Sequence, residues 1–404
     1  MRLALLTLLF ASHVHAGDWP QYFGPTRNGI STDTGLARTW GTDGPKVLWK
    51  KPLGSGWSAP VILGDKLILF YRVENEEVVE CLDATTGKSQ WKQSHRTRYV
   101  DEFGFDNGPR STPVMADKRV FTLGADGDLS AFDLAEGEKL WQRNINKDYE
   151  VEKSFFGVAT SPLIANGKLI VNVGAKGAGV VAFALGSGKE LWKSTNDGVS
   201  YSSPVLAKID GEELAVFFTR KGLLALKPGD GKEMYSFPWR PRLNASVNAA
   251  SPIVFENQIF LSTSYSTGAI VLEASKGELK EIWKGDNSLS CHYNTPVLFK
   301  EHLYGIDGRQ EGGKAQLRCV DWKTGKVLWK EEGFGCATLT LADGLLLAMA
   351  ETGDLVLIEP NPEKYKELAR AAILEKPVRA ATALSRGKFY ARDGGKLVCV
   401  QVGK

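Results

Sequence analysis

Ser187-Gly-Lys-Glu-Leu-Trp-Lys193 is the stretch that decides the fold, because variants of it recur along almost the whole chain. The clearest copies are Asp83-Ala-Thr-Thr-Gly-Lys-Ser-Gln-Trp91, Asp133-Leu-Ala-Glu-Gly-Glu-Lys-Leu-Trp141 and Asp321-Trp-Lys-Thr-Gly-Lys-Val-Leu-Trp329, and weaker copies are Gly231-Lys-Glu-Met-Tyr235, the stretch from Gly277 to Trp283 and the fragment Val47-Leu-Trp49. In a clear copy, Asp and Thr can bond the backbone of a turn, and Gly supplies a positive φ. The strand that follows delivers a large aromatic ring four residues after the Gly. A motif repeated in this way indicates a repeat architecture.

A second marker, Ser-Pro or Thr-Pro or a near relative, opens each repeat. It occurs at Pro60, Pro113, Pro162, Pro204, Pro252 and Pro296, and Thr338-Leu339 and Ala381-Thr382 continue the series without proline. Proline fits the first residue of a strand, which need not donate to a ladder. Alternating runs such as Lys118-Arg-Val-Phe-Thr-Leu123 lie between the two markers, so each repeat is predicted to form four short antiparallel strands. Four-stranded units at a period of about 46 residues are typical of a β-propeller.

The number of blades follows from how the ring closes. The last repeat, from Ala381 to Val402, supplies only three strands. The isolated strand Lys46–Lys50 carries the missing tryptophan, so we expect it to pair with the last blade and close the ring. Residues 46–404 then divide into eight blades of about 45 residues each, which fits the period. The segment 362–374 has a helix-favouring composition, but its position predicts the outer strand of the seventh blade.

The first residues have the pattern of a secretory signal. Arg2, an apolar run from Leu3 to Ala11, and Val14-His-Ala16 predict a signal peptide over residues 1–16, cleaved after Ala16. No segment predicts a membrane span, and Gly17 in place of Cys gives no sign of a lipid anchor. We therefore expect a periplasmic or secreted protein. Residues 17–45 lack the repeat and are expected to pack on the propeller as an irregular segment, across its edge.

Composition and charge narrow the classes of function. The chain has 43% hydrophobic residues, 43 Gly and 11 Trp, which agrees with an all-β globular protein, and the continuous repeat predicts one propeller domain over residues 46–404. The 50 basic and 47 acidic residues give a formal net charge of +3. This near-balance gives no reason to expect binding to nucleic acid or to an acidic membrane surface. We expect a monomer.

The five cysteines are interpreted mainly as packing residues. Cys81, Cys319 and Cys399 occupy one position of the repeat that Ala fills in other copies, which is typical of a small apolar site. Their blades are too far apart for disulfides. Cys291 and Cys336 precede the inner strands of neighbouring blades, so a bridge between them is a minor alternative.

These motifs resemble a known family. The Asp-x-x-Thr-Gly-Lys-x-x-Trp copies with Ser/Thr-Pro openings are similar to the tryptophan-docking repeats of pyrroloquinoline-quinone-like (PQQ-like) eight-bladed propellers, which include quinoprotein alcohol dehydrogenases and the outer-membrane assembly factor BamB. Secreted stand-alone PQQ-binding-like β-propeller repeat proteins are the most similar group. The phrases Trp19–Gly29, Asn107–Pro113 and Tyr365–Ala369 resemble recurrent phrases of that group. The resemblance covers residues 18–404 and is specific for the fold, whereas the motif builds blades and does not perform chemistry.

The same resemblance disfavours an enzyme. Quinoprotein dehydrogenases typically carry two adjacent cysteines beside the quinone and a Glu/Asn/Asp calcium site, and this chain has no adjacent cysteines and no Cys-x-x-Cys-His haem motif. It also lacks His-Glu-x-x-His, Gly-x-Ser-x-Gly and a phosphate loop. Its histidines outside the signal, at 95, 292 and 302, do not have metal-ligand spacing. We expect no metal and no cofactor, with PQQ and calcium as the alternative.

The candidate site is the axial funnel, where the residues before each inner strand converge. The candidates are Trp57, Arg110, Phe156, Tyr201, Asn248, Tyr265, His292, Tyr293, Asn294 and Arg379. Aromatic and hydrogen-bonding side chains are expected of a binding depression. His292 could polarise a ligand or make a hydrogen bond between blades. Arg110 and Arg379 could pair with an anion, or with inter-blade carboxylates such as Asp126 or Asp393.

Two long connections, Gln93–Asn107 and Arg143–Ser154, emerge on the same face and either carry function or cover strand edges. The leading hypothesis is a non-catalytic binding or scaffold propeller that recognises a protein or small ligand through loops at one face of the funnel. Its partner would be an envelope protein, a peptide or a glycan. The alternative is a PQQ-dependent oxidoreductase.

Overall fold

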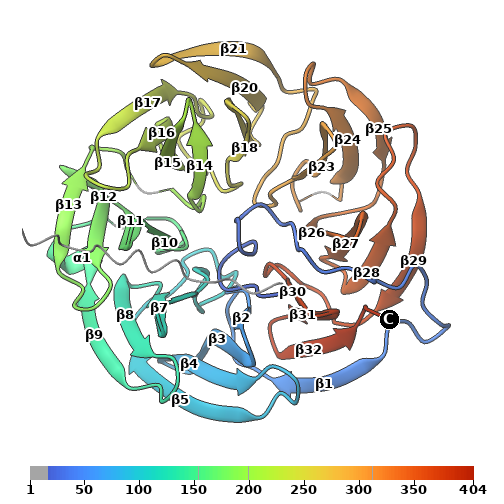
Figure 1. Ribbon diagram of the computed structural model, residues 1–404, viewed down its shortest axis with the longest axis horizontal. Coiled ribbons are helices and arrows are strands. Elements are labelled where there is room, and N and C mark those ends of the chain that lie inside the picture. The colour runs from blue at the N-terminus through green and yellow to red at the C-terminus, as the bar shows by residue number, and fades with distance from the viewer. Residues whose placement is uncertain (1–16, 153, 199, 312) are drawn as a thin grey trace, which may run out of the picture.

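The computed structural model describes residues 17–404 apart from 153, 199 and 312, and the expected signal peptide at 1–16 lies outside the described residues. The described residues form eight four-stranded antiparallel sheets around one axis (Figure 1), so the predicted eight-bladed all-β propeller is confirmed. In this part of the chain, none of the helices combines the length and apolar character needed to cross a bilayer.

The strands follow one another from the axis outward in each blade, and we number the blades in chain order. Blade 1 contains β2 (Val61–Leu63), β3 (Lys66–Val73), β4 (Glu76–Asp83) and β5 (Ser89–Arg96); blade 2 contains β6 (Val114–Ala116), β7 (Arg119–Leu123), β8 (Asp128–Asp133) and β9 (Lys139–Asn144); and blade 3, after the short helix α1 (Ile145–Asp148), contains β10 (Leu163–Ala165), β11 (Lys168–Ala175), β12 (Ala178–Ala184) and β13 (Glu190–Ser194). Blade 4 contains β14 (Val205–Ile209), β15 (Glu212–Phe218), β16 (Gly222–Leu226) and β17 (Glu233–Pro238); blade 5 contains β18 (Ile253–Phe255), β19 (Gln258–Thr263), β20 (Gly268–Ser275) and β21 (Glu278–Gly285); and blade 6 contains β22 (Val297–Phe299), β23 (His302–Asp307), β24 (Gln316–Asp321) and β25 (Val327–Glu331). Blade 7 contains β26 (Ala337–Ala342), β27 (Leu345–Ala350), β28 (Asp354–Ile358) and β29 (Glu367–Ala372), and blade 8 contains β30 (Ala383–Ser385), β31 (Lys388–Arg392), β32 (Lys396–Gln401) and β1 (Val47–Pro52).

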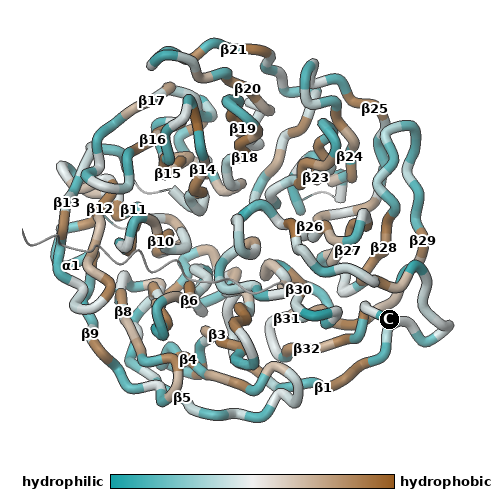
Figure 2. The backbone as a smooth tube through the Cα atoms, viewed as in Figure 1, coloured by the Kyte–Doolittle hydropathy of each residue, from teal (hydrophilic) through white to brown (hydrophobic). Residues whose placement is uncertain are grey.

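The first strand closes the ring, as predicted. β1 pairs antiparallel with β32 and places Trp49 opposite Cys399. The helix-favouring segment 362–374 forms β29, the outer strand of blade 7, so the blade context prevails over helix propensity there. Figure 2 shows hydrophobic residues concentrated in the inner strands, whereas the outer strands alternate with polar residues and face solvent on one side.

The recurring Gly and Trp dock neighbouring blades to each other. Gly188 in blade 3 has φ +65°, and a Cβ on it would lie 2.6 Å from the Trp141 ring of blade 2. The Trp141 indole N–H donates to the Leu185 carbonyl oxygen at 2.9 Å. The equivalent rings dock on the glycines of the following blades at Gly87, Gly137, Gly231 and Gly325. The turn therefore needs Gly both for its left-handed backbone and for the space that the ring fills.

The residue opposite each tryptophan in the ladder explains the cysteine pattern. Cys81 pairs with Trp91 and Cys319 with Trp329, while Ala131 fills the same position in blade 2. All five cysteines of the chain are free and buried, so Cys291 and Cys336 are not bridged. Burial raises the pKa of the Cys81 thiol to about 11, as expected for an inert packing residue.

The Ser/Thr-Pro marker also connects the blades. The Thr112 backbone N–H donates to the Ser161 hydroxyl at 3.0 Å, and the Ser161 N–H donates in turn to the Ser203 hydroxyl at 3.0 Å. Ser251 and Thr295 repeat the contact between blades 5 and 6 at 2.9 Å. Each hydroxyl thus satisfies a buried donor of the blade before it, close to the axis.

The segment before β1 crosses the axis and does not simply follow the edge, which corrects the expectation for residues 17–45. Trp19 forms a bridge with Ile62 of blade 1. The Arg27 guanidinium donates to the Pro162 carbonyl oxygen, just before blade 3, at 2.7 Å. The Ser31 backbone N–H donates to the Leu341 carbonyl oxygen in blade 7 at 2.8 Å. The dark-blue chain in Figure 1 runs across the centre of the ring accordingly.

Candidate functional site

A cavity of about 170 Å³ lies on the propeller axis. It is lined by Tyr22, Phe23, Trp57, Phe105, Arg110, Phe156, Ala159, Tyr201, Ser203, Val247, Ala249, His292, Tyr293, Asn294, Gln310, Thr338, Arg379 and Ala381. All of the residues predicted from the sequence contribute to this lining except Asn248 and Tyr265. The prediction had no means of including Phe105 and Gln310, which come from loops that differ between blades.

The floor of the cavity comes from the segment before β1. Phe23 packs with Ala59 and Ala381, and Tyr22 lies against this cluster. Desolvation raises the pKa of the Tyr22 phenol to about 12, so this group stays neutral. Tyr22 and Phe23 of this segment therefore line the cavity together with Phe105 and Phe156 from the face where the long connections emerge.

Two arginines flank Trp57 in the funnel wall. The guanidinium carbon of Arg110 lies 4.7 Å from the centroid of the Trp57 ring, and that of Arg379 lies 5.1 Å from it. Arg110 pairs with Asp101 at 2.9 Å, and Arg379 pairs with Glu351 at 2.7 Å. Carboxylates of the protein thus neutralise both cations. The flat faces of the two guanidinium groups form a part of the wall that apolar groups can contact.

The carboxylates suggested from the sequence are not the partners of these arginines. Asp126 accepts from the Thr97 hydroxyl at 2.9 Å and from the Arg98 N–H at 2.6 Å. Asp393 accepts from the Gly395 N–H at 2.8 Å. Asp393 therefore serves its own turn, whereas Asp126 of blade 2 holds the connection that follows blade 1.

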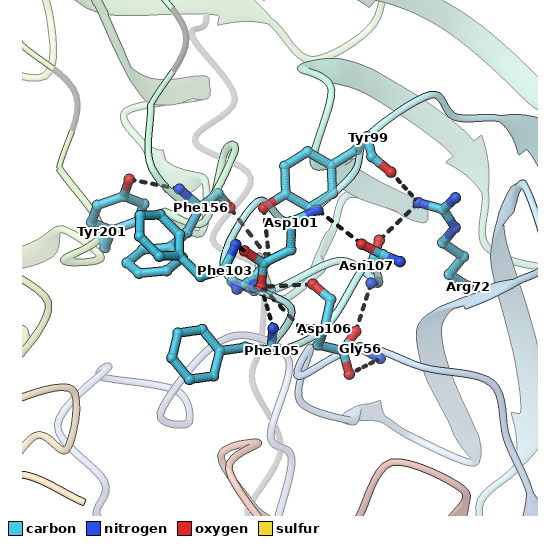
Figure 3. Close-up of polar contacts among 12 residues, drawn as sticks. Gly56, Arg72, Tyr99, Asp101, Phe103, Phe105, Asp106, Asn107, Phe156 and Tyr201 are labelled. Carbon is cyan, nitrogen blue, oxygen red and sulfur yellow. Dashed lines mark hydrogen bonds and ion pairs between the residues drawn. The ribbon is translucent and has the colours of Figure 1, made fainter. Parts of the chain in front are cut away.

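Asp101 organises the first long connection, which Figure 3 shows in close-up. Its buried carboxylate accepts from the backbone N–H groups of Phe103 and Phe105, both at 3.0 Å, as well as from Arg110. Arg72 holds the far side of the loop by donating to the Tyr99 carbonyl oxygen at 2.6 Å. The loop is therefore fixed by charge-assisted hydrogen bonds although it has no regular secondary structure.

This loop holds phenyl rings out toward solvent. Phe103 is 53% exposed, Phe105 46% and Phe155, from the second long connection, 43%. We call these three residues the aromatic platform. The centroid of the Phe103 ring lies 6.0 Å from that of Phe155 and 5.2 Å from that of Phe156 in the cavity wall. The platform is thus continuous with the cavity, because Phe105 and Phe156 also line it.

His292 lies between polar side chains of blades 5 and 6. Its Nδ1 lies 2.8 Å from the Gln310 side-chain oxygen, which can only accept, so Nδ1 carries the proton. The Tyr265 hydroxyl lies 2.9 Å from Nε2 and donates to it. Burial lowers the pKa of His292. Because Tyr265 belongs to blade 5 and Gln310 to blade 6, these contacts match the interpretation of an inter-blade hydrogen bond.

Asn248 has a structural environment. It is 1% exposed, and its amide donates to the Thr219 carbonyl oxygen at 2.8 Å. The side-chain oxygens of Asn248 and Asn294 are both buried and have no hydrogen-bond partner among the described residues. Asn294 is among the residues that line the cavity, whereas Asn248 is not.

The residues of the funnel do not fit PQQ with calcium. No Asp or Glu is among the lining residues, so the cavity offers no carboxylate to a hard cation. Among the described residues, no three His, Cys, Asp or Glu side chains are grouped to hold a metal ion. A volume of about 170 Å³ is below the range of small-molecule pockets, roughly 300–1,000 Å³, and close to that of a cavity that holds one benzene ring.

Comparisons with known proteins agree with this architecture. A family model described as outer membrane protein assembly factor BamB matches residues 29–199 and 75–331. The BamB protein of Burkholderia pseudomallei (strain K96243) is 26% identical over 229 residues, which are 54% of this chain and 55% of the relative. The quinohemoprotein alcohol dehydrogenase ADH-IIG of Pseudomonas putida is 29% identical over 203 residues, which are 48% of this chain and 27% of the relative.

Solved structures share the fold. BamB from Moraxella catarrhalis has a TM-score of 0.66 at 14% identity, covering 88% of this chain and 99% of that one. Quinohemoprotein alcohol dehydrogenase from Comamonas testosteroni has a TM-score of 0.68 at 14% identity, covering 96% of this chain and 81% of that one. Since the family model spans well over half of the sequence, the chain belongs to the outer membrane protein assembly factor BamB family of PQQ-like β-propeller repeat proteins.

Proposed function

We propose that this protein is a non-catalytic binding propeller that recognises a polypeptide partner through the mouth of its axial funnel. The observation that carries the proposal is a ring-sized cavity continuous with the exposed aromatic platform. The polar groups that could do chemistry there, those of Arg110, Arg379 and His292, are engaged by the protein itself. What remains open to a partner is apolar surface with a few acceptors, which suits recognition.

We further infer an extracytoplasmic location. The signal pattern at residues 1–16 supports it, and the matched relative is named as an outer membrane assembly factor. A periplasmic location is tested by adding a protease to intact cells and to cells whose outer membrane has been permeabilised. The protein should be protected in the intact cells and cleaved in the permeabilised cells. Sensitivity only after complete lysis would contradict it.

Photo-crosslinking tests the binding function. Phe105→p-benzoylphenylalanine places the reactive group at the funnel mouth, and Leu191→p-benzoylphenylalanine places it on an exposed outer strand. Irradiation in the native envelope should give a discrete polypeptide adduct from position 105 that is absent from position 191. Equal adducts from both positions, no adduct from position 105, or adducts to glycan alone would contradict the proposal.

The dehydrogenase relative supports a second candidate, a PQQ-dependent oxidoreductase. Adding PQQ and calcium and measuring thermal stability and dye reduction with alcohols separates the two functions. The binding function predicts no change in Tm and no reduction. A raised Tm together with alcohol-dependent dye reduction would establish the oxidoreductase instead.

A further inference from the structure

The rim of the funnel has an apolar side. Close to half of each side chain is exposed at Phe103, Phe105 and Phe155. Burial of a phenyl ring stabilises a protein, and these rings lack that stabilisation. The loop that presents two of them is fixed by the buried Asp101 carboxylate and cannot simply fold them inward. Rigid, exposed aromatic rings beside a pocket are typical of the central residues of binding interfaces.

A basic group belongs to blade 4, on the face where the long connections emerge. Arg220 lies in the turn between β15 and β16, and Arg240 and Arg242 follow β17 in the same blade. We call these three residues the basic arc. None of them makes an ion pair with a carboxylate among residues 17–404 that the structure describes, whereas the cavity arginines are both paired. Within the described residues, the three arginines of the arc therefore carry positive charge that no carboxylate compensates.

Hydrogen bonds fix Arg220, the first residue of the basic arc, close to the cavity. Arg220 donates to the Ser246 hydroxyl at 3.0 Å and to the Asn244 carbonyl oxygen at 2.7 Å. Burial and the neighbouring Arg240 lower the pKa of Arg220, and a bound carboxylate would offset the repulsion between the two cations. Ser246, which Arg220 contacts, is followed directly by Val247 in the cavity lining.

We propose that the funnel mouth binds an extended polypeptide segment in which an aromatic side chain is followed within a few residues by acidic side chains. The aromatic ring enters the cavity, a neighbouring apolar residue packs on the aromatic platform, and the carboxylates meet the basic arc. This inference rests on the proposed binding function and specifies the chemistry of its partner. The cavity volume admits one ring, and hydrophobic anchoring with charge complementarity gives both affinity and register.

A polypeptide fits these observations better than a nucleic acid. Single-stranded nucleic acid needs a continuous basic groove along its backbone together with stacking rings. Here the rings come from the connections after blades 1 and 2, the arginines belong to blade 4, and the chain is close to neutral, with a formal net charge of +3. Labelled oligo(dT) is included below as the competing ligand.

Fluorescence anisotropy with labelled twelve-residue peptides tests the inference on the full protein. The probe carries one Phe followed by three acidic residues in a Gly/Ser background. One control peptide replaces Phe by Ala, and the other replaces the acids by Lys. We expect saturable binding of the probe, at least about tenfold weaker binding of each control peptide, and weakening at higher salt.

Protein variants localise the binding. Two double variants should each weaken binding of the probe peptide by about tenfold or more. One combines Phe103→Ser with Phe105→Ser, and the other combines Arg240→Glu with Arg242→Glu. Leu140→Ser and Lys208→Glu are exposed matched controls away from the mouth and should leave the affinity unchanged. The Arg240→Glu, Arg242→Glu protein should in addition bind the Lys peptide better than the acidic probe, a reversal that loss of folding cannot produce.

Each outcome decides the inference. Equal affinity for the three peptides, equal loss in the matched controls, absence of the charge reversal, or tighter binding of oligo(dT) than of the probe overturns it. If the peptides fail but the position-105 crosslink persists, the binding function stands with a partner of different chemistry. If both fail, the binding function fails as well.

Discussion

Trp49, in the first strand of the chain, packs against Tyr390 in the last blade, with 5.9 Å between the ring centroids. The same indole also fills the space above Gly87 in blade 1, where a Cβ would lie 2.7 Å from it. A residue from the start of the chain thus joins blade 8 to blade 1. The indole-over-glycine contact that Trp91, Trp141, Trp192 and Trp283 make with the next blade is thus repeated at the closure of the ring. Within the described residues, the Trp49 indole N–H has no hydrogen-bond partner, so packing alone makes this contact.

Removing this indole should weaken the closure. Trp49→Ala is expected to lower the free energy of unfolding by about 3 kcal/mol, because a large ring is lost from a packed contact between two blades. Urea denaturation monitored by circular dichroism measures the change. Lys50→Ala in the same strand is exposed and should change stability by less than about 0.5 kcal/mol. Equal effects of the two substitutions would contradict the docking role.

The docking glycines can be tested without changing backbone strain. Gly188 and Gly167 have φ values of +65° and +67°, but only a Cβ on Gly188 would meet a ring, that of Trp141. Gly188→Ala is therefore expected to cost about 1–3 kcal/mol more than Gly167→Ala, as typical for overpacking. Thermal and chemical denaturation of both variants provide the comparison. Identical losses would mean that only the left-handed backbone matters.

The loop that carries the aromatic platform should depend on Asp101. Asp101→Ala leaves the Arg110 cation without its carboxylate partner and the Phe103 and Phe105 N–H groups without their acceptor. We expect a loss of about 3–5 kcal/mol, the usual effect of breaking a buried pair, and faster hydrogen exchange at these amides. Asp148→Ala removes an exposed partner of Arg143 and should cost less than about 1 kcal/mol. Unchanged exchange in Asp101→Ala would contradict the account of the loop.

Stability should fall at mildly acidic pH because of His292. Burial lowers the pKa of His292 in the folded state. As the pH falls through about 6.5, the imidazole is therefore protonated in the unfolded chain before it is protonated in the folded protein. The contribution of His292 to the free energy of unfolding is thus fully present above that pH and is lost below it. His292→Gln should reduce the slope of unfolding free energy against pH between 7.5 and 5.5, by at most about 1.4 kcal/mol per pH unit. An identical slope in the variant would show that His292 does not titrate as described.

The fold could be predicted because the residues that make its decisive contacts recur in one short local pattern. Each Gly and the Trp four residues after it belong to one turn and strand, so the pattern is visible without knowing which blade the ring meets. The isolated Lys46–Lys50 strand supplied the blade count for the same reason. The acceptor role of the Ser/Thr hydroxyls near the axis was not predicted, because it appears only when neighbouring blades are brought together.

The site could be predicted only in part. Residues before the inner strands converge by symmetry, which brought Arg110, Tyr201 and Arg379 to the cavity. The loops themselves do not repeat, so nothing in the sequence indicated that Asp101 and Glu351 would pair with these arginines. The cavity floor at Tyr22 and Phe23 depends on a segment outside the repeat, and its path follows from packing across the whole ring.

The claim that the axial cavity receives one aromatic group of a partner is tested most directly by methyl NMR. N-acetylphenylalaninamide is titrated into alanine-methyl-labelled protein, with Ala159, Ala249 and Ala381 reporting from the cavity wall and Ala135 from an exposed turn. We predict saturable chemical-shift changes that are confined to the cavity methyls. The changes at Ala159 and Ala381 should be abolished when Ala249→Phe fills the space. Shifts spread over Ala135, or a titration unaffected by Ala249→Phe, would contradict it.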